Sequence, residues 1–338
     1  MINAKIIRQI FVLVLIILIG GLIFKEMLPY FSGVLGAITL YVLLKKIMTK
    51  LINNGWHPNL AAGLLMLLSF IIILLPTIGL IWMLSNKIGD FITNSEKVVI
   101  AFKTQLSDFE SRFGYDFTSQ IDASAVSSWL SENLQGFAGG TFTAFIAISI
   151  MYFLLFYMLT NRKQLRKSLF EYIPISDENL KIIGTKTRKM VRANALGIPL
   201  VAIAQGVIAL IGFLIFDIEN PMFWTVIVTI GSMIPFVGSL LGILPVFILT
   251  ISNGNTFQAW GILLYGIIIV GSTDNIIRLF VLKKLDDVHP LITLIGVIVG
   301  IPLFGFIGLI FGPLLISLLL IIIQIYKKEY GKGSKEIA

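Results

Sequence analysis

Long apolar runs alternate with short polar stretches along most of the chain. The first five runs cover residues 7–24, 28–44, 60–84, 141–160 and 195–216. Each has about the 20 residues that an α-helix needs to cross the ~30 Å hydrocarbon core of a bilayer. This pattern predicts an all-α, polytopic membrane protein built as a bundle of helices.

Three apolar blocks remain after the fifth run, at residues 222–251, 257–282 and 290–326. The first and third blocks are too long for one span of ~20 residues and too short for two. Pro235 and Gly238 interrupt the first block within "GSMIPFVGSLLGILP", and Pro302 and Gly305 interrupt the third within "IPLFGFIG". Segments broken by Gly and Pro in matching positions indicate discontinuous helices at a transport site.

We interpret each broken block as a re-entrant helical hairpin whose tip is buried at mid-membrane. Irregular backbone is tolerated at that depth only where protein covers it or a watery cavity receives it. Span 195–216 with the first hairpin, and helix 257–282 with the second, then form two helix-hairpin units of inverted orientation. The alternative is a long tilted helix kinked at proline in each block; the clustering of breakers favours hairpins.

These patterns divide the chain into five parts. They are N-terminal scaffold spans (1–84), an extracytoplasmic amphipathic helical insert (85–140), a fourth span with a basic cytoplasmic loop (141–194), an inverted-repeat transport region with two re-entrant hairpins (195–326) and a basic cytoplasmic tail (327–338). Apolar residues of the insert recur at helical spacing from Val98 to Phe113. We expect an extramembrane packing element there, not a catalytic domain.

Composition supports the membrane assignment. Of 338 residues, 57% are hydrophobic and 13% charged, whereas soluble domains carry about 25% charged residues. The net charge of +8 comes from basic clusters near residue 5, at 45–50, at 162–192 and in the tail. Basic loops face the cytoplasm, so we place both termini there and explain the charge without nucleic acid.

Few residues offer enzymatic or metal chemistry. There is no cysteine, and the two histidines, His57 and His289, are far apart and each precede a proline at the start of an apolar segment. Proline at a first helical position explains both placements. We therefore expect no enzymatic activity, no metal site and no cofactor. Any pumping is then driven by an ion gradient or by the gradient of the substrate.

Asp274 and Arg278 are the only charges well inside an apolar span. Ionisable groups at that depth are costly and suggest a transport pathway or coupling site. In the alternative, the two residues form a structural pair at i and i+4 that neutralises itself, or Arg278 extends to the interface.

Uncharged polar groups in apolar surroundings complete the set of candidates. Asn275 and Gln205 can bind a polar solute or hydrogen-bond across helices, and the glycines can serve close packing alone. Hydroxyls and freed carbonyls at the hairpin tips can coordinate a solute or Na⁺. The candidate solute- or ion-binding residues are Asp274, Asn275, Gln205, Ser232, Pro235, Gly238, Ser239, Arg278, Pro302 and Gly305.

Several motifs resemble a known family. "IGSMIPFVGSLLGILP", "DN" at 274–275, "HPL" at 289–291 and "GIPLFGFIGLIFGPLL" resemble the autoinducer-2 exporter family of bacterial transporters. The resemblance implies export of a small solute across the inner membrane, with exchange of Na⁺ for protons in some members. It also implies a homo-oligomer, namely a pentamer.

These observations predict a secondary transporter that exports a small polar solute, similar to autoinducer-2, by alternating access. The hairpin-bearing C-terminal half would move against the N-terminal scaffold, and Asp274 would respond to H⁺ or Na⁺. One alternative is a Na⁺/H⁺ antiporter. Another is a channel-like or structural membrane oligomer in which the Asp274–Arg278 pair is inert.

Overall fold

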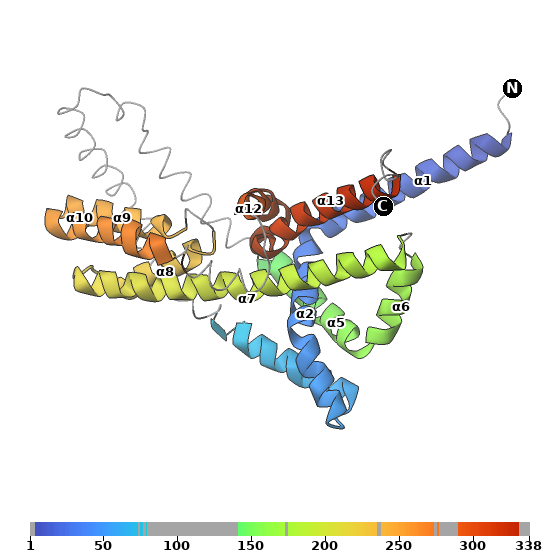
Figure 1. Ribbon diagram of the computed structural model, residues 1–338, viewed down its shortest axis with the longest axis horizontal. Helices are drawn as coiled ribbons and strands as arrows, with labels where there is room; N and C mark the ends of the chain where they lie inside the picture. The colour runs from blue at the N-terminus through green and yellow to red at the C-terminus, as the bar shows by residue number, and fades with distance from the viewer. Residues whose placement is uncertain are drawn as a thin grey trace, which may run out of the picture.

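The computed structural model describes residues 4–73, 75–76, 79, 141–172, 175–234, 238–273, 276 and 290–330. In these residues every regular element is a helix (Figure 1). Five helical stretches among them are long and apolar enough to cross a membrane. The predicted all-α, polytopic fold is therefore confirmed.

The N-terminal helices follow the apolar runs closely. α1 (Ala4–Met27) ends at the short 3₁₀ turn η1 (Leu28–Tyr30), and α2 (Phe31–Asn53) follows. The next helix is Pro58–Ile73, and α5 (Thr141–Thr160) coincides with the predicted fourth span. The expected extracytoplasmic insert at 85–140 lies outside the described residues.

Small residues let α2 and α5 approach closely. A side chain at Gly33 would collide with the backbone of Ala147, and one at Gly36 would collide with Met151. These two helices and helix Pro58–Ile73 share an apolar core that includes Leu40, Leu65 and Leu155. In contrast, α1 projects away from the body in Figure 1 and is exposed along its described length.

The basic segment predicted as a loop is helical. It contains α6 (Arg162–Tyr172) and the first half of α7 (Asp177–Ile215). The Ser176 hydroxyl caps α7 by accepting a hydrogen bond from the backbone N–H of Asn179 (3.4 Å). Asp177 and Glu178 in the first turn stabilise the same helix end through the helix dipole. With 39 residues, α7 is about 58 Å long. It includes most of the predicted fifth span (195–216) and begins 18 residues before it.

The first broken block folds back on itself. α8 (Pro221–Gly231) and α9 (Leu240–Ser252) are joined by the segment that contains the breakers. Gly231 lies against Gly238, and Gly242 lies against Val228, so the two helices are antiparallel. The block is thus a helical hairpin in place of one kinked helix. The position of its tip within a bilayer stays a prediction.

The second broken block also reverses direction. α12 (Pro290–Phe304) leads through the 3₁₀ turn η4 (Gly305–Ile307) into α13 (Gly308–Tyr330). Gly300 packs against Gly308, and Gly296 packs against Gly312. The turn requires a φ of +63° at residue 305, which glycine adopts without steric cost. The re-entrant placement of this hairpin likewise stays a prediction.

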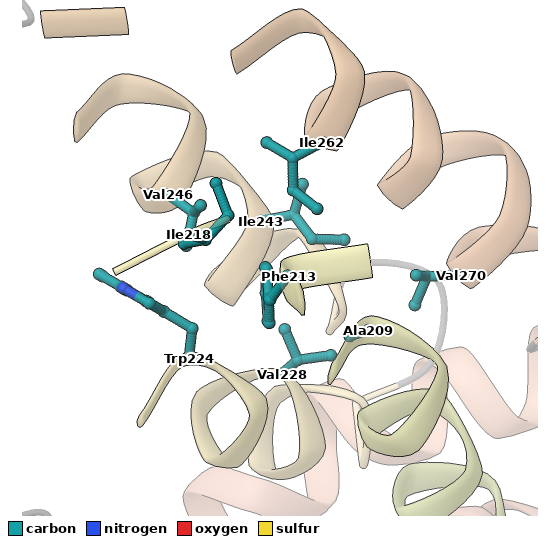
Figure 2. Packing of buried hydrophobic residues seen from close by; sticks show 9 residues of the cluster. All are labelled: Ala209, Phe213, Ile218, Trp224, Val228, Ile243, Val246, Ile262 and Val270. Carbon is teal, nitrogen blue, oxygen red and sulfur yellow. The ribbon is translucent and has the colours of Figure 1, made fainter. Parts of the chain in front are cut away.

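The hairpin α8–α9 packs with the second half of α7 and with α10 (Thr256–Tyr265), which continues into the π-helix η3 (Gly266–Val270). We call residues 200–273, without the undescribed 235–237, the tip module. Its apolar core is shown in Figure 2 and consists of Ala209, Phe213, Ile218, Trp224, Val228, Ile243, Val246, Ile262 and Val270. In Figure 1 the tip module lies at one end of α7.

Candidate functional site

One end of the tip module buries polar side chains. The middle of the module is apolar, with Phe213 and Val228 fully buried. Toward the tip of the α8–α9 hairpin, buried polar residues take the place of apolar ones. They are Gln205 (2% exposed), Ser232 (4%), Ser239 (8%) and Thr273 (9%).

The antiparallel register of the helices explains why these residues share one end. Gly261 packs against Phe216 and Gly212 against Tyr265, so α10 runs antiparallel to α7. The same register brings Gln205 to Val270. In Figure 2, Val270 and Ala209 lie at the opposite end of the core from Trp224 and Ile218. Most of the module's buried polar side chains therefore lie at the tip end, and the remaining one, Thr250 (8% exposed), lies near the loop end of α9.

Gln205 bonds across helices. Its Nε2 donates a hydrogen bond to the Val270 carbonyl oxygen (3.2 Å), which is the packing role that we considered for this residue. Val270 is the last residue of η3, and π-helical turns disturb the regular backbone ladder, often at functional sites. Three residues further on, the Thr273 hydroxyl donates to the Ile269 carbonyl oxygen (2.7 Å).

Ser232 is the unusual residue of this end. Its Oγ is buried and has no hydrogen-bond partner within the described part of the chain, although its backbone N–H donates to the Val228 carbonyl oxygen (2.8 Å). An unsatisfied buried hydroxyl costs about 1–3 kcal/mol. A hydroxyl offers one donor and two acceptor lone pairs, so Ser232 can bind a polar group that enters the tip.

The two helix ends at the tip contribute partial charges of opposite sign. Ser232 directly follows the C-terminus of α8, and Ser239 directly precedes the N-terminus of α9. The carbonyl end of a helix carries partial negative charge and the amide end partial positive charge. The tip can therefore accommodate a cation near α8 or a polarised oxygen of a solute near α9.

The other two candidates that the structure describes lie on the second hairpin. Pro302 and Gly305 are exposed, and the neighbouring Phe304 stacks on Phe31 of α2 at 6.2 Å between ring centroids. Leu303 and Phe306 at the same tip are 48% and 64% exposed. This tip is apolar and packs on α2, and it shows none of the buried hydroxyls found at the first hairpin.

Four candidates, Pro235, Asp274, Asn275 and Arg278, lie outside the described residues. The predicted pairing or coupling role of the two charges stays a prediction. Thr273 is the last described residue before Asp274. Within the described ranges, no cluster of His, Cys, Asp or Glu can hold a metal ion.

Two residues that bury polar groups, Thr273 and Tyr152, are not among the candidates predicted from the sequence. Thr273 gave a usable indication, since it directly precedes the intramembrane "DN" pair. Tyr152 gave none: its hydroxyl is buried without a partner in the described part of the molecule, and its ring lies 5.9 Å from that of Phe70. The contact of this ring with Phe70 joins two segments that are distant in sequence, and the local sequence does not specify it.

The fold and the polar tip describe a polytopic membrane protein with two helical hairpins, one of which buries a hydroxyl that has no hydrogen-bond partner among the described residues. Residues 11–328 match the family described as AI-2E family transporter. Because this match covers nearly the whole chain, the protein belongs to the AI-2E transporter family, and its role is membrane transport.

Several bacterial relatives agree with this class. A protein of Aquifex aeolicus is 23% identical over 80% of this chain and 83% of its own length. One of Mycobacterium tuberculosis is 27% identical over 62% of this chain and 54% of its own length. YdiK of Escherichia coli is 33% identical over 38% of this chain and 34% of its own length. Each is named as a candidate transport protein, and none of the names specifies a substrate.

Proposed function

We propose that this protein is a secondary transporter that exports a small polar solute, similar to autoinducer-2, by alternating access. The proposed solute site is the polar end of the tip module, formed by Gln205, Ser232, Ser239 and Thr273. The observation that carries the assignment is the buried hydroxyl of Ser232, which has no hydrogen-bond partner among the residues that the structure describes. A bound solute hydroxyl or carbonyl would supply the missing hydrogen bond.

The chemistry of this end suits a small, uncharged, oxygen-rich solute. Hydroxyl and amide groups both donate and accept hydrogen bonds, and they carry no net charge. The apolar core directly below the tip limits how deep such a solute enters. In this proposal Asp274, next in sequence after Thr273, responds to the coupling ion, which is H⁺ or Na⁺.

The same end supports a Na⁺/H⁺ antiporter as the second candidate. Ser232 lies at the carbonyl end of α8, where partial negative charge favours a cation. An intramembrane carboxylate such as Asp274 is the minimum chemistry for exchanging that cation with a proton. On the family resemblance we also propose the bacterial inner membrane, cytoplasmic termini and a pentameric homo-oligomer.

Uptake into inside-out membrane vesicles tests the exporter. Vesicles that contain the full-length protein are screened over candidate solutes, starting with autoinducer-2, under an imposed H⁺ or Na⁺ gradient. We expect Ser232→Ala to reduce gradient-coupled uptake about tenfold, the effect of losing ~1.4 kcal/mol of binding. Ser69→Ala is the matched control, because Ser69 is equally buried on helix Pro58–Ile73 and donates to the Met66 carbonyl oxygen.

Proteoliposomes separate the alternatives. Ion exchange that persists without organic solute and disappears in Asp274→Asn favours the antiporter. Conductance without coupling, or no flux of any kind, favours a channel-like or structural oligomer. Full uptake by Ser232→Ala would remove the tip of the first hairpin as the solute site.

A further inference from the structure

α7 connects two groups of helices. Its second half belongs to the tip module. Its first half packs on α2 and α13, in a core that includes Leu35, Val191 and Phe311. In the described part of the chain, no other helix packs extensively against both groups. Figure 1 shows α7 running along much of the molecule, with the tip module at one end and the remaining helices toward the other.

The second hairpin belongs with the N-terminal helices. Its tip residue Phe304 stacks on Phe31 of α2. On α13, the Ile310 carbonyl oxygen accepts a hydrogen bond from Asn194 Nδ2 of α7 (3.1 Å). The first contact is with α2, and the second is with the part of α7 that precedes Pro199. We call this group, with α2, helix Pro58–Ile73 and α5, the scaffold.

Pro199 lies between the two polar attachments of α7. Asn194 ties the first half of the helix to the second hairpin, and Gln205 ties the second half to η3. Pro199 is inside the helix, where proline removes one i→i−4 hydrogen bond and its ring opposes straight helical geometry. Sharp helix kinks almost always occur at proline or a few other local causes, so Pro199 is the point at which we expect α7 to bend.

We propose that Pro199 is a hinge at which the tip module moves as one body, while the second hairpin stays with the scaffold. The proposal rests on the alternating-access function and narrows it. The moving part is residues 200–273, which is less than the C-terminal half that the sequence suggested. The polar tip of the first hairpin would thereby slide past a fixed second hairpin.

The size of the movement follows from the length of the lever. The helix from Pro199 to Ile215 is about 24 Å long at ~1.5 Å per residue. A change of about 20° in a proline kink therefore moves its far end by about 8 Å. α10 packs on that end through Gly261 and Phe216, so the same displacement applies to the start of α10.

Spin-label distances within one protomer test this division, measured in lipid nanodiscs on full-length labelled chains diluted with unlabelled chains. The chain contains no cysteine, so pairs of introduced cysteines report without background. Exposed sites are Leu60 on the scaffold (69% exposed), Phe306 on the second hairpin (64%) and Phe257 on α10 (84%). We expect one narrow Leu60–Phe306 distance. Both distances to Phe257 should show two populations separated by up to about 8 Å, the displacement derived from the lever length above.

Two proline variants identify the hinge. Pro199→Ala should collapse both Phe257 distributions to one population, whereas Pro245→Ala, a matched change inside α9, should leave them unchanged. A variable Leu60–Phe306 distance with a fixed Phe306–Phe257 distance would overturn the proposal, because both hairpins would then move together. Single populations for every pair in the unmodified sequence would overturn it too. Since no flux is measured, failure here is separate from failure of the solute assignment.

Discussion

At the scale of single residues, the tip module contains two buried polar side chains with opposite consequences for stability. The amide of Gln205 satisfies a carbonyl of a neighbouring helix, whereas the hydroxyl of Ser232 is buried without a partner in the described part of the chain. A satisfied group stabilises by about 1 kcal/mol and an orphaned one costs free energy. Residues that break local rules without compensation are expected at functional sites.

Replacing Gln205 should destabilise the protein. In Gln205→Leu the Val270 carbonyl oxygen loses its side-chain donor inside the core, and we expect the free energy of unfolding to fall by about 1–3 kcal/mol. Thermal unfolding in detergent, followed by tryptophan fluorescence, measures this loss. Gln164→Leu on the exposed face of α6 is the control and should change stability by less than about 0.5 kcal/mol. Equal melting of the two variants would contradict the role of this bond.

Replacing Ser232 should have the opposite sign. Ser232→Ala removes the orphaned hydroxyl and should raise the free energy of unfolding by up to about 1–3 kcal/mol, while it lowers transport. The same unfolding measurement, made on protein without added solute, tests this. A lower melting temperature for Ser232→Ala would mean that the hydroxyl has a stabilising partner and would weaken its assignment to a solute.

At the scale of elements, glycine pairs set how closely the hairpin helices pack. Gly238 faces Gly231 in the first hairpin, and Gly300 faces Gly308 and Gly312 in the second. In each case an added Cβ would meet backbone atoms of the opposite helix. Backbone cannot move aside as the end of a flexible side chain can, so these contacts tolerate only glycine.

Gly300→Ala should therefore destabilise the second hairpin by about 1–3 kcal/mol, the usual cost of overpacking. Gly63→Ala is the matched control, because Gly63 is also helical and a Cβ added there meets nothing within 4 Å. There alanine should be neutral or stabilise by up to about 1 kcal/mol through helix propensity. Opposite shifts in melting temperature are the expected result; equal shifts would show that the glycine contact is looser than described.

Several elements could be predicted from the sequence because the length of an uninterrupted apolar run shows whether a helix can cross the bilayer. This was enough for α5 and for the break between α1 and α2, and the clusters of Gly and Pro located both reversals. Apolarity says nothing about polar helices, so the pattern predicts a basic cytoplasmic connection there but not the helices α6 and the start of α7. The partners of Gln205, Asn194 and Phe304 depend on contacts between distant segments, which no local pattern specifies.

At the scale of the whole molecule, α7 and the first hairpin have lengths that relate to the bilayer in opposite ways. α7 is about 58 Å long, so part of it must extend beyond a ~30 Å hydrocarbon core. Its first half carries the exposed basic residues Lys181, Lys186, Arg188, Lys189 and Arg192, which favours the cytoplasmic side. α8 and α9, with 11 and 13 residues, are only about 17 and 20 Å long.

Labelling of single cysteines with a membrane-impermeant maleimide tests both the orientation and the re-entrant first hairpin. The exposed sites are Lys186 on α7, Glu219 before α8 and Asn253 after α9. We expect Glu219→Cys and Asn253→Cys to react from the outside of intact cells, and Lys186→Cys only in inside-out vesicles. Two flanking sites on one face, joined by helices shorter than the ~30 Å core, leave the tip inside the membrane. Reaction of Glu219→Cys and Asn253→Cys from opposite faces would mean that this block crosses the bilayer, and the buried polar tip would then lose its place at mid-membrane.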